Sequence, residues 1–230
     1  MDTYPVALKL NNRLCLVVGG GKVGERKIAT LLECGAVVRV VSPESTSQVA
    51  EWARSGQIEL RQRCFQEEDL DGVLVVIAAT DCYEVNQDVS RVCDERQVIV
   101  NAVDIPDLCS FYVPAVLRRG LLTIAVSTGG ASPKLAAKIR DSLSEQFGPD
   151  YGRYLELIAG WRRRVLAEIA DTDRREAFLK HIVDDVTLEL IQKEQYDLLK
   201  ERLEDVYCGY GSQSPQRPGS CPGEDVFFRK

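Results

Sequence analysis

The chain has 230 residues, 45% of them hydrophobic and 28% charged, which is enough for one or two globular domains with a substantial core. Its formal net charge of −6 argues against a nucleic-acid-binding protein, because such proteins take most of their affinity from a basic surface. No apolar run approaches the ~20 residues that span a bilayer, and no signal peptide precedes the first predicted strand. We therefore expect a cytoplasmic protein that binds neither membranes nor nucleic acids.

The cysteines are scattered along the chain without a C-x-x-C pair. In a chain without an export signal, such cysteines are expected to be reduced and mostly buried thiols rather than a disulfide framework or a zinc site. They are Cys15, Cys34, Cys64, Cys82, Cys93, Cys109, Cys208 and Cys221.

The chain begins with a predicted strand, turn and helix. Alternation over Val6 to Leu10 predicts a small strand, and the apolar run from Leu14 to Val18 predicts the first core strand. Glycines at G-x-G-x-x-G spacing follow, and a helical pattern comes directly after them. In a dinucleotide site such glycines make the turn, admit a pyrophosphate to the backbone and let the helix pack on the sheet. The predicted cofactor-binding residues here are Gly19, Gly21, Lys22, Val23 and Gly24.

Strands and helices then alternate up to about residue 113. Such alternation predicts a parallel sheet with right-handed crossovers, and thus an α/β, Rossmann-like domain over residues 1–113. The expected strands cover 37–41, 58–60, 73–79 and 98–103, and the expected helices 48–54 and 84–95.

Residues 114–148 predict one strand, Leu121 to Val126, and one helix that begins at Ser132-Pro133. One face of this helix carries Leu135, Ile139, Leu143 and Phe147. A lone strand and helix cannot bury its own apolar face, so it must pack on the first domain or on a second copy of the chain. We favour a dimerisation segment and a homodimer.

Residues 149–207 read as an all-helical domain. The first helical face holds Tyr154, Ile158, Trp161, Val165 and Ile169, the next Phe178, Ile182 and Val186, and the third Leu199, Leu203 and Val206. Residues 208–230 are rich in Gly, Ser, Pro and Gln, which predicts a disordered tail.

Polar residues follow three predicted strands, at the edge where open α/β sheets bind ligands. The second strand ends at Ser42-Pro43 rather than at the usual Asp or Glu, although Glu44 is close enough to reach a ribose. No arginine follows this strand to receive a 2′-phosphate, which favours NAD over NADP. The other two predicted cofactor contacts at this edge are Thr80-Asp81 and Asn101.

Asp104 leaves a buried strand at the same edge, beside Pro106. It could be a general base whose pKa is tuned by partial burial, or equally a turn-forming carboxylate.

His181 is the only histidine and lies far along the chain from this edge, so we do not expect it to be catalytic. Tyr196 and Lys200 match the Y-x-x-x-K spacing of short-chain dehydrogenases, but we interpret them as a packing residue and a solvated charge.

An arginine cluster stands out in this acidic chain. Guanidinium groups pair bidentately with carboxylates, so the cluster is either a solvated helix face or a site for a substrate with several carboxylates. Its members are Arg162, Arg163, Arg164, Arg174 and Arg175.

Several motifs occur together in a fixed order: YPVALKL, VVGGGKVGERK, IAATD with a following Asn, NAVDIPDLCSF and VSTGGASPKLAAKIR. This series resembles the N-terminal module of siroheme synthase, strongly over residues 1–147 and more loosely to about 206. That family comprises precorrin-2 dehydrogenases, many of them also sirohydrochlorin ferrochelatases.

The resemblance implies a homodimer that oxidises precorrin-2 to sirohydrochlorin with NAD, in a cleft between subunits. It assigns the catalytic carboxylate to Asp104, which would also be a transient landing site for iron if ferrous iron is a substrate. It assigns the loop of Ser127, Thr128 and Gly129 to the tetrapyrrole. Fused family members carry a methyltransferase domain, which we do not expect in this chain.

Two rival hypotheses remain. The first is a non-enzymatic NAD sensor whose helical region binds a protein. The second is a short-chain-type dehydrogenase of another small molecule, which would need Tyr196 and Lys200 beside the nicotinamide.

Overall fold

The structure, a computed structural model, describes residues 3–211. The chain divides into two compact units. The first comprises the residues up to 113 together with 127–132, and the second comprises 114–126 together with the residues from 133 onward.

The first unit is built on a five-stranded parallel sheet with the order β3-β2-β1-β4-β5. In its centre Val17 of β1 pairs with Val40 of β2 on one side and with Ile77 of β4 on the other. The strands are β1 Leu14–Gly20, β2 Val37–Ser45, β3 Ile58–Arg61, β4 Val75–Ala78 and β5 Ile99–Ala102. The predicted Rossmann-like α/β fold is thereby confirmed, with crossovers that place helices on both faces.

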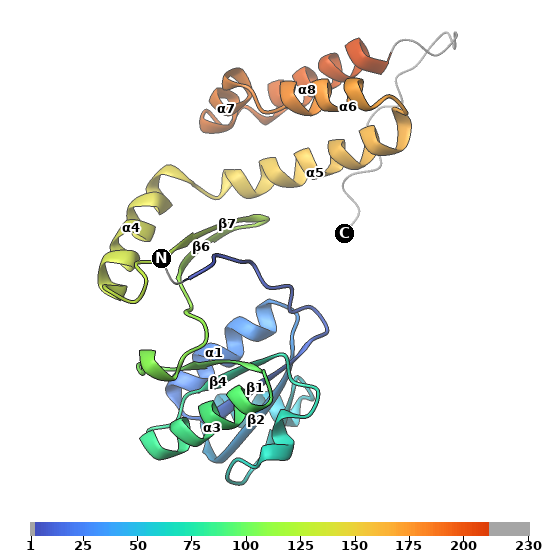
Figure 1. Ribbon diagram of the computed structural model, residues 1–230. Coiled ribbons are helices and arrows are strands. Elements are labelled where there is room, and N and C mark those ends of the chain that lie inside the picture. The colour runs from blue at the N-terminus through green and yellow to red at the C-terminus, as the bar shows by residue number, and fades with distance from the viewer. Residues whose placement is uncertain (1–2, 212–230) are drawn as a thin grey trace. The chain divides into compact units, whose positions relative to one another are not determined.

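Helices cover the two faces of this sheet, as Figure 1 shows for α1 and α3. On one face α1 (Lys22–Glu33) and α2 (Ser47–Arg54) bury Ile28 and Val49 against β1, β2 and β4. On the other face α3 (Tyr83–Glu95) buries Val89 and Val92 together with Leu70, the last residue of the short helix η1 (Glu67–Leu70). A second short helix, η2 (Pro106–Leu108), follows β5.

Two details of this unit differ from the sequence prediction. Residues 3–10 form no strand, and Tyr4 and Val6 are exposed, because β1 already pairs with β2 and β4. Strand β2 continues to Ser45 beyond the predicted end at Val41. The apolar pattern could not mark this extension, since Ser42 to Ser45 are polar or proline.

The second unit begins with an antiparallel hairpin of β6 (Ala115–Arg119) and β7 (Leu122–Val126). The prediction of a lone strand was wrong, because β6 was missed. Gly120 makes the turn with φ +55°, and its backbone contacts Gly152 of the following helical region. Helix α4 (Pro133–Gln146) packs on the hairpin but leaves Leu135 and Ile139 of its predicted apolar face 50% and 39% exposed.

The remaining helices pack around one cluster, which includes Trp161, Val165, Phe178, Leu199 and Leu203. They are α5 (Asp150–Glu168), α6 (Thr172–His181), α7 (Asp185–Gln192) and α8 (Tyr196–Gly211). The predicted face of Phe178, Ile182 and Val186 is divided between two helices, since Asp184 caps a new one.

Helix α8 continues through residues 208–211, so the predicted tail was wrong for these residues. The rest of that prediction, 212–230, lies outside the described part of the chain. Within residues 3–211, no helix has both the length and the apolar character needed to cross a membrane.

The seven cysteines that the structure describes are thiols. Cys15 and Cys93 are buried, and burial raises their pKa to about 11 and about 12 respectively. Cys64, Cys82 and Cys208 are exposed, so the prediction of mostly buried thiols was wrong for these three.

Candidate active site

The turn between β1 and α1 is shaped by close backbone contacts. Gly19 adopts φ +109°, and a Cβ added there would lie 2.5 Å from the carbonyl oxygen of Ala79. A Cβ at Gly24 would lie 2.1 Å from the carbonyl oxygen of Gly19, so helix α1 begins in direct contact with the turn. Gly21 is the N-cap of α1 and has nothing within 4 Å of an added Cβ, so its side toward the cavity is open. The first N–H groups of α1 can therefore face an anion.

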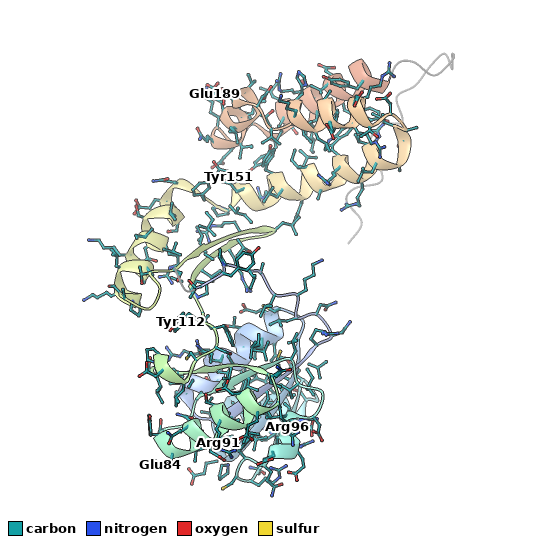
Figure 2. The ribbon with its side chains drawn as sticks, in the orientation of Figure 1. Glu84, Arg91, Arg96, Tyr112, Tyr151 and Glu189 are labelled. Carbon is teal, nitrogen blue, oxygen red and sulfur yellow. The ribbon has the colours of Figure 1, made fainter. Side chains whose placement is uncertain are left out.

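A cavity of about 1040 Å³ lies over this turn. Four segments bound it: the β1–α1 turn, the end of β2, residues 64–65 after β3, and the β4–α3 connection, which leads to Glu84 at the start of α3 (Figure 2). The predicted cofactor residues among its lining are Gly19, Gly21, Lys22, Val23, Ser42, Pro43, Thr80 and Asp81. Gly24 and Asn101 are not among the lining residues.

The end of β2 presents a carboxylate to this cavity. The buried Ser42 hydroxyl donates to the carbonyl oxygen of Glu44 at 2.6 Å, so its proton is already used within the strand. Glu44 lines the cavity and is exposed. Because Ser42 is buried whereas Glu44 carries an exposed carboxylate, Glu44 is the better placed of the two to accept from a ribose hydroxyl.

At the end of β4 the structure adds a residue that the sequence analysis missed. Asn86 of α3 is buried, its Nδ2 donates to the carbonyl oxygen of Thr80 at 2.9 Å, and its Oδ1 accepts from the Thr80 hydroxyl at 2.8 Å. Asn86 thereby fixes the cavity wall that Thr80 and Asp81 form. The IAATD…N motif contained this asparagine, but its spacing alone did not reveal the contact.

Asp104 lies just past β5, one strand beyond β4 at the same edge of the sheet. Its φ is +62°, which is uncommon for a residue other than glycine, and its side chain is exposed. The partial burial that we expected at Asp104 is therefore not provided within the chain itself. Lys27 of α1 is half-buried, and burial lowers its pKa, as does the charge of Arg26, while the negative charge of Asp104 acts in the opposite direction.

The segment after Asp104 is tied back to β5. Asn101 is buried, and its Nδ2 donates to the carbonyl oxygen of Phe111 at 3.0 Å. The Ser110 hydroxyl accepts from the Val100 N–H at 2.7 Å, and the Cys109 thiol donates to the carbonyl oxygen of Ala102 at 3.1 Å. Asn101 therefore anchors the loop that presents Asp104.

The loop predicted to bind the tetrapyrrole is held by its own hydroxyls. The Ser127 hydroxyl accepts from the Gly129 N–H at 3.2 Å, and that of Thr128 accepts from the Ser132 N–H at 3.0 Å. Gly129 and Gly130 both have positive φ, and space is open around each. Ser127, Thr128 and Gly129 stay predicted substrate contacts.

Three other candidates lie in the helical unit, outside the cavity lining. His181 Nδ1 lies 2.9 Å from the carbonyl oxygen of Ala177 and 2.8 Å from the Tyr210 hydroxyl. Tyr196 packs against the helical cluster, and burial raises its pKa to about 12, whereas a tyrosine acid–base group must ionise more easily. Lys200, the other member of that pair, is exposed on the same helix, α8.

The predicted arginine cluster is divided. Arg164 lies 4.9 Å from the Trp161 ring centre and 4.2 Å from that of Tyr207, and it pairs with Glu168 and Glu204. This arginine therefore packs the helices together and does not face a substrate. The other four members are Arg162 and Arg163, exposed on α5, and the half-buried Arg174 and Arg175 on α6.

Comparison with known families covers nearly the whole chain. Residues 6–115 match a model described as putative NAD(P)-binding. Residues 119–146 match the sirohaem biosynthesis protein central region, and residues 150–206 match the sirohaem synthase dimerisation region.

Individual proteins agree with these matches. Siroheme synthase from Thioalkalivibrio sulfidiphilus is 40% identical over 204 residues, which are 89% of this chain and 42% of that protein. The Methylobacillus flagellatus siroheme synthase is 37% identical over 211 residues, 92% of this chain and 45% of the relative. The chain thus spans less than half the length of these relatives.

A solved structure of SirC, a precorrin-2 dehydrogenase, superimposes with a TM-score of 0.73 at 30% identity, covering 88% of this chain and 100% of that one.

Proposed function

The chain belongs to the siroheme synthase family, and from this premise we propose that it is an NAD-dependent precorrin-2 dehydrogenase of siroheme biosynthesis. The observation that carries the proposal is the likeness to SirC, a precorrin-2 dehydrogenase whose whole length is covered by this chain at 30% identity. The precorrin-2 substrate would be oxidised to sirohydrochlorin.

The cavity fits a dinucleotide. The open backbone at Gly21 and the start of α1 would hold the pyrophosphate, and Glu44 would accept from the adenosine ribose hydroxyls. A carboxylate at that position repels a 2′-phosphate, which favours NAD over NADP. When bound, NAD supplies the hydride acceptor of the reaction.

Asp104 is the proposed catalytic base. The sheet order places β2 and β3 on one side of β1, and β4 and β5 on the other. With the pyrophosphate over the β1 turn and the adenosine over β2, the nicotinamide half extends toward β4 and β5, where Asp104 lies. The exposed Asp104 carboxylate would take the proton that the tetrapyrrole loses as its hydride leaves, while Asn101 holds the loop in place.

We further propose a homodimer. The match to the dimerisation region over residues 150–206 supports it, as does exposed apolar surface at Ile139 of α4 and Leu166 of α5. Sedimentation equilibrium should give twice the chain mass at micromolar concentration. A monomer throughout the accessible concentration range would contradict this.

The deciding experiment is an anaerobic assay of the wild-type chain and of Asp104→Asn with precorrin-2 and NAD. We expect NADH to form with the wild type, and the rate to fall by roughly a hundredfold or more in the variant, which lacks the base. NADH affinity should be equal in the two proteins. An unchanged rate in Asp104→Asn would remove this residue from catalysis, and no NADH formation by the wild type would refute the function.

The second activity, insertion of ferrous iron, can be tested in the same reaction mixture. After precorrin-2 is consumed, ferrous iron is added and the absorbance change on metal insertion into sirohydrochlorin is followed. Insertion above the rate without protein would make ferrous iron a second substrate. Asp104→Asn would then also lower this rate if its carboxylate receives the metal or the pyrrole protons.

The rival hypothesis of an NAD sensor predicts a different outcome. Such a protein would bind NADH saturably, but it would produce no NADH when it is mixed with precorrin-2 and NAD. The cytoplasmic location expected from the sequence stays a prediction.

A further inference from the structure

A buried carboxylate lies beside the cofactor cavity, in a segment that the motif analysis left unassigned. The Asp69 side chain is 0% exposed, and its Oδ1 lies 2.6 Å from Arg61 Nη1 and 2.7 Å from Arg63 Nη2. Its Oδ2 accepts from Arg63 Nη1 at 2.8 Å and from the Gln66 N–H at 2.9 Å. Arg63 thus binds this carboxylate with both terminal nitrogens, the strongest geometry for an arginine–carboxylate pair.

The network extends into the sheet. Arg39 of β2 donates through Nη1 to the carbonyl oxygen of Asp69 at 3.0 Å and through Nε to Glu59 at 2.8 Å. Glu59 of β3 accepts in turn from Arg61 Nε at 2.7 Å. Asp69 therefore joins two strands and the short helix η1, and the chain between them, residues 62–66, is held at both ends.

Residues 62–66 contribute to the cavity wall. Cys64 and Phe65 both line the cavity, and Phe65 is half-buried against the cluster formed by Leu70 and Val89. Arg63 also donates to the carbonyl oxygen of Cys64 at 2.9 Å, which connects the buried ion pair directly to this wall.

The position of the wall identifies which part of the cofactor it meets. Strand β3 lies beyond β2, on the side away from β1. The β1 turn takes the pyrophosphate and the end of β2 takes the adenosine ribose, so the residues after β3 bound the adenine end. Among the lining residues that the structure describes, Phe65 is the only aromatic one, and flat bases stack on aromatic rings.

We propose that Phe65 is the stacking surface for the adenine ring of the cofactor, and that Asp69 is a positioning residue that holds the Phe65 loop against the cavity. The inference rests on the proposed NAD-dependent function and adds two residues to it. Without the Asp69 carboxylate, Arg61 and Arg63 would face each other as like charges, and the loop that carries Cys64 and Phe65 would lose its anchor.

The test is a direct measurement of NADH binding to the full chain. The fluorescence of the dihydronicotinamide ring reports the binding. Phe65→Ala should raise the dissociation constant of NADH roughly tenfold, since the stacking surface is removed. Asp69→Asn should raise it by a similar factor. Arg63→Gln, which leaves the Arg61 and Gln66 contacts to Asp69, is the milder variant and should give a smaller increase. The matched control is Glu67→Gln, which removes an exposed carboxylate from the same short helix.

The double variant Phe65→Ala, Asp69→Asn tests whether Asp69 acts through Phe65. If Asp69 acts through Phe65, the double variant should bind NADH no more weakly than Phe65→Ala alone. If Asp69 affects NADH binding independently of Phe65, the two effects should multiply. The affinities for ADP-ribose, measured by calorimetric titration, should show the same pattern, because ADP-ribose carries the adenine but no nicotinamide.

The outcomes distinguish this inference from the proposed function. If the wild type binds no NADH, the proposed function fails. If the wild type binds NADH and Phe65→Ala binds it equally well, the stacking role alone is refuted. Multiplicative effects, or unchanged affinity in both folded Asp69→Asn and folded Arg63→Gln, refute the positioning role.

Discussion

The carbonyl oxygen of Ala79 would lie 2.5 Å from a Cβ placed on Gly19, so β4 passes the β1 turn without room for a side chain. Gly19 also has φ +109°, a conformation that side-chain-bearing residues rarely adopt. The same close approach brings the end of β4, with Thr80 and Asp81, to the turn that would hold the pyrophosphate.

Gly19→Ala should therefore destabilise the first unit and abolish cofactor binding together. The strained φ alone costs about 1–3 kcal/mol, and the contact with Ala79 adds to it. Urea unfolding should show a lower midpoint, and NADH titration should show no saturation at concentrations that saturate the wild type.

Gly21→Ala is the matched control, since nothing lies within 4 Å of its added Cβ and its φ of −74° suits alanine. It should unfold within about 0.5 kcal/mol of the wild type but bind NADH more weakly, because the methyl group enters the open side of the turn. Equal stability of Gly19→Ala and Gly21→Ala would contradict the geometry of this turn.

The acid stability of the protein should depend on Asp69. Burial raises the pKa of this carboxyl, but hydrogen bonds from Arg63, the Gln66 N–H and Arg61 outweigh burial and lower it from 3.8 to about 2. Because the folded value lies below the unfolded one, the stabilisation is complete above about pH 4 and is lost as the pH falls through about 2. The difference corresponds to about 2 kcal/mol.

Urea midpoints measured between pH 2 and pH 6 would test this. In Asp69→Asn the protein should be less stable at pH 6, and the part of the acid dependence between pH 4 and pH 2 should be smaller. The control variant Glu67→Gln should keep the wild-type dependence. An identical pH dependence in Asp69→Asn would show that the carboxyl does not titrate in that window.

Cysteine reactivity should report cofactor binding. Cys64 and Cys82 are exposed and line the cavity, whereas burial raises the pKa of Cys15 and Cys93 to about 11 and about 12. Iodoacetamide at pH 8 should modify the first two thiols in minutes and leave the buried pair intact. Saturating NADH should slow the modification of Cys64 and Cys82, as peptide mass spectrometry would measure. Equal rates with and without NADH, in a protein that binds it, would place the cofactor elsewhere.

Tyr196 should be dispensable for the reaction. Its hydroxyl is buried among helices, and burial raises its pKa to about 12. Tyr196→Phe removes only this hydroxyl and should leave the kcat and KM for precorrin-2 and NAD within about twofold of the wild type. A thousandfold loss of kcat in a folded Tyr196→Phe protein would instead revive the short-chain dehydrogenase hypothesis.

Local patterns in the sequence were enough to predict the Rossmann-like sheet and the turn that begins at Gly19. Apolar runs marked each of the five parallel strands, and glycine spacing marked the place where backbone must approach backbone. These features depend on neighbours within a few residues along the chain, so the sequence alone is enough to predict them. The hairpin strand β6 was missed because Ala115 to Arg119 alternate weakly and end in two arginines.

Tertiary structure alone decided which side chains act together. Asn86 supports Thr80, Asn101 anchors the Asp104 loop across ten residues, and Arg164 lies between Trp161 and Tyr207 from different helices. Likewise, Asp69 of η1 forms buried ion pairs with Arg61 and Arg63, and the sequence shows these residues only as scattered charges. Such contacts arise where separate elements pack, and the periodicity of any one element carries no information about the neighbour it will meet.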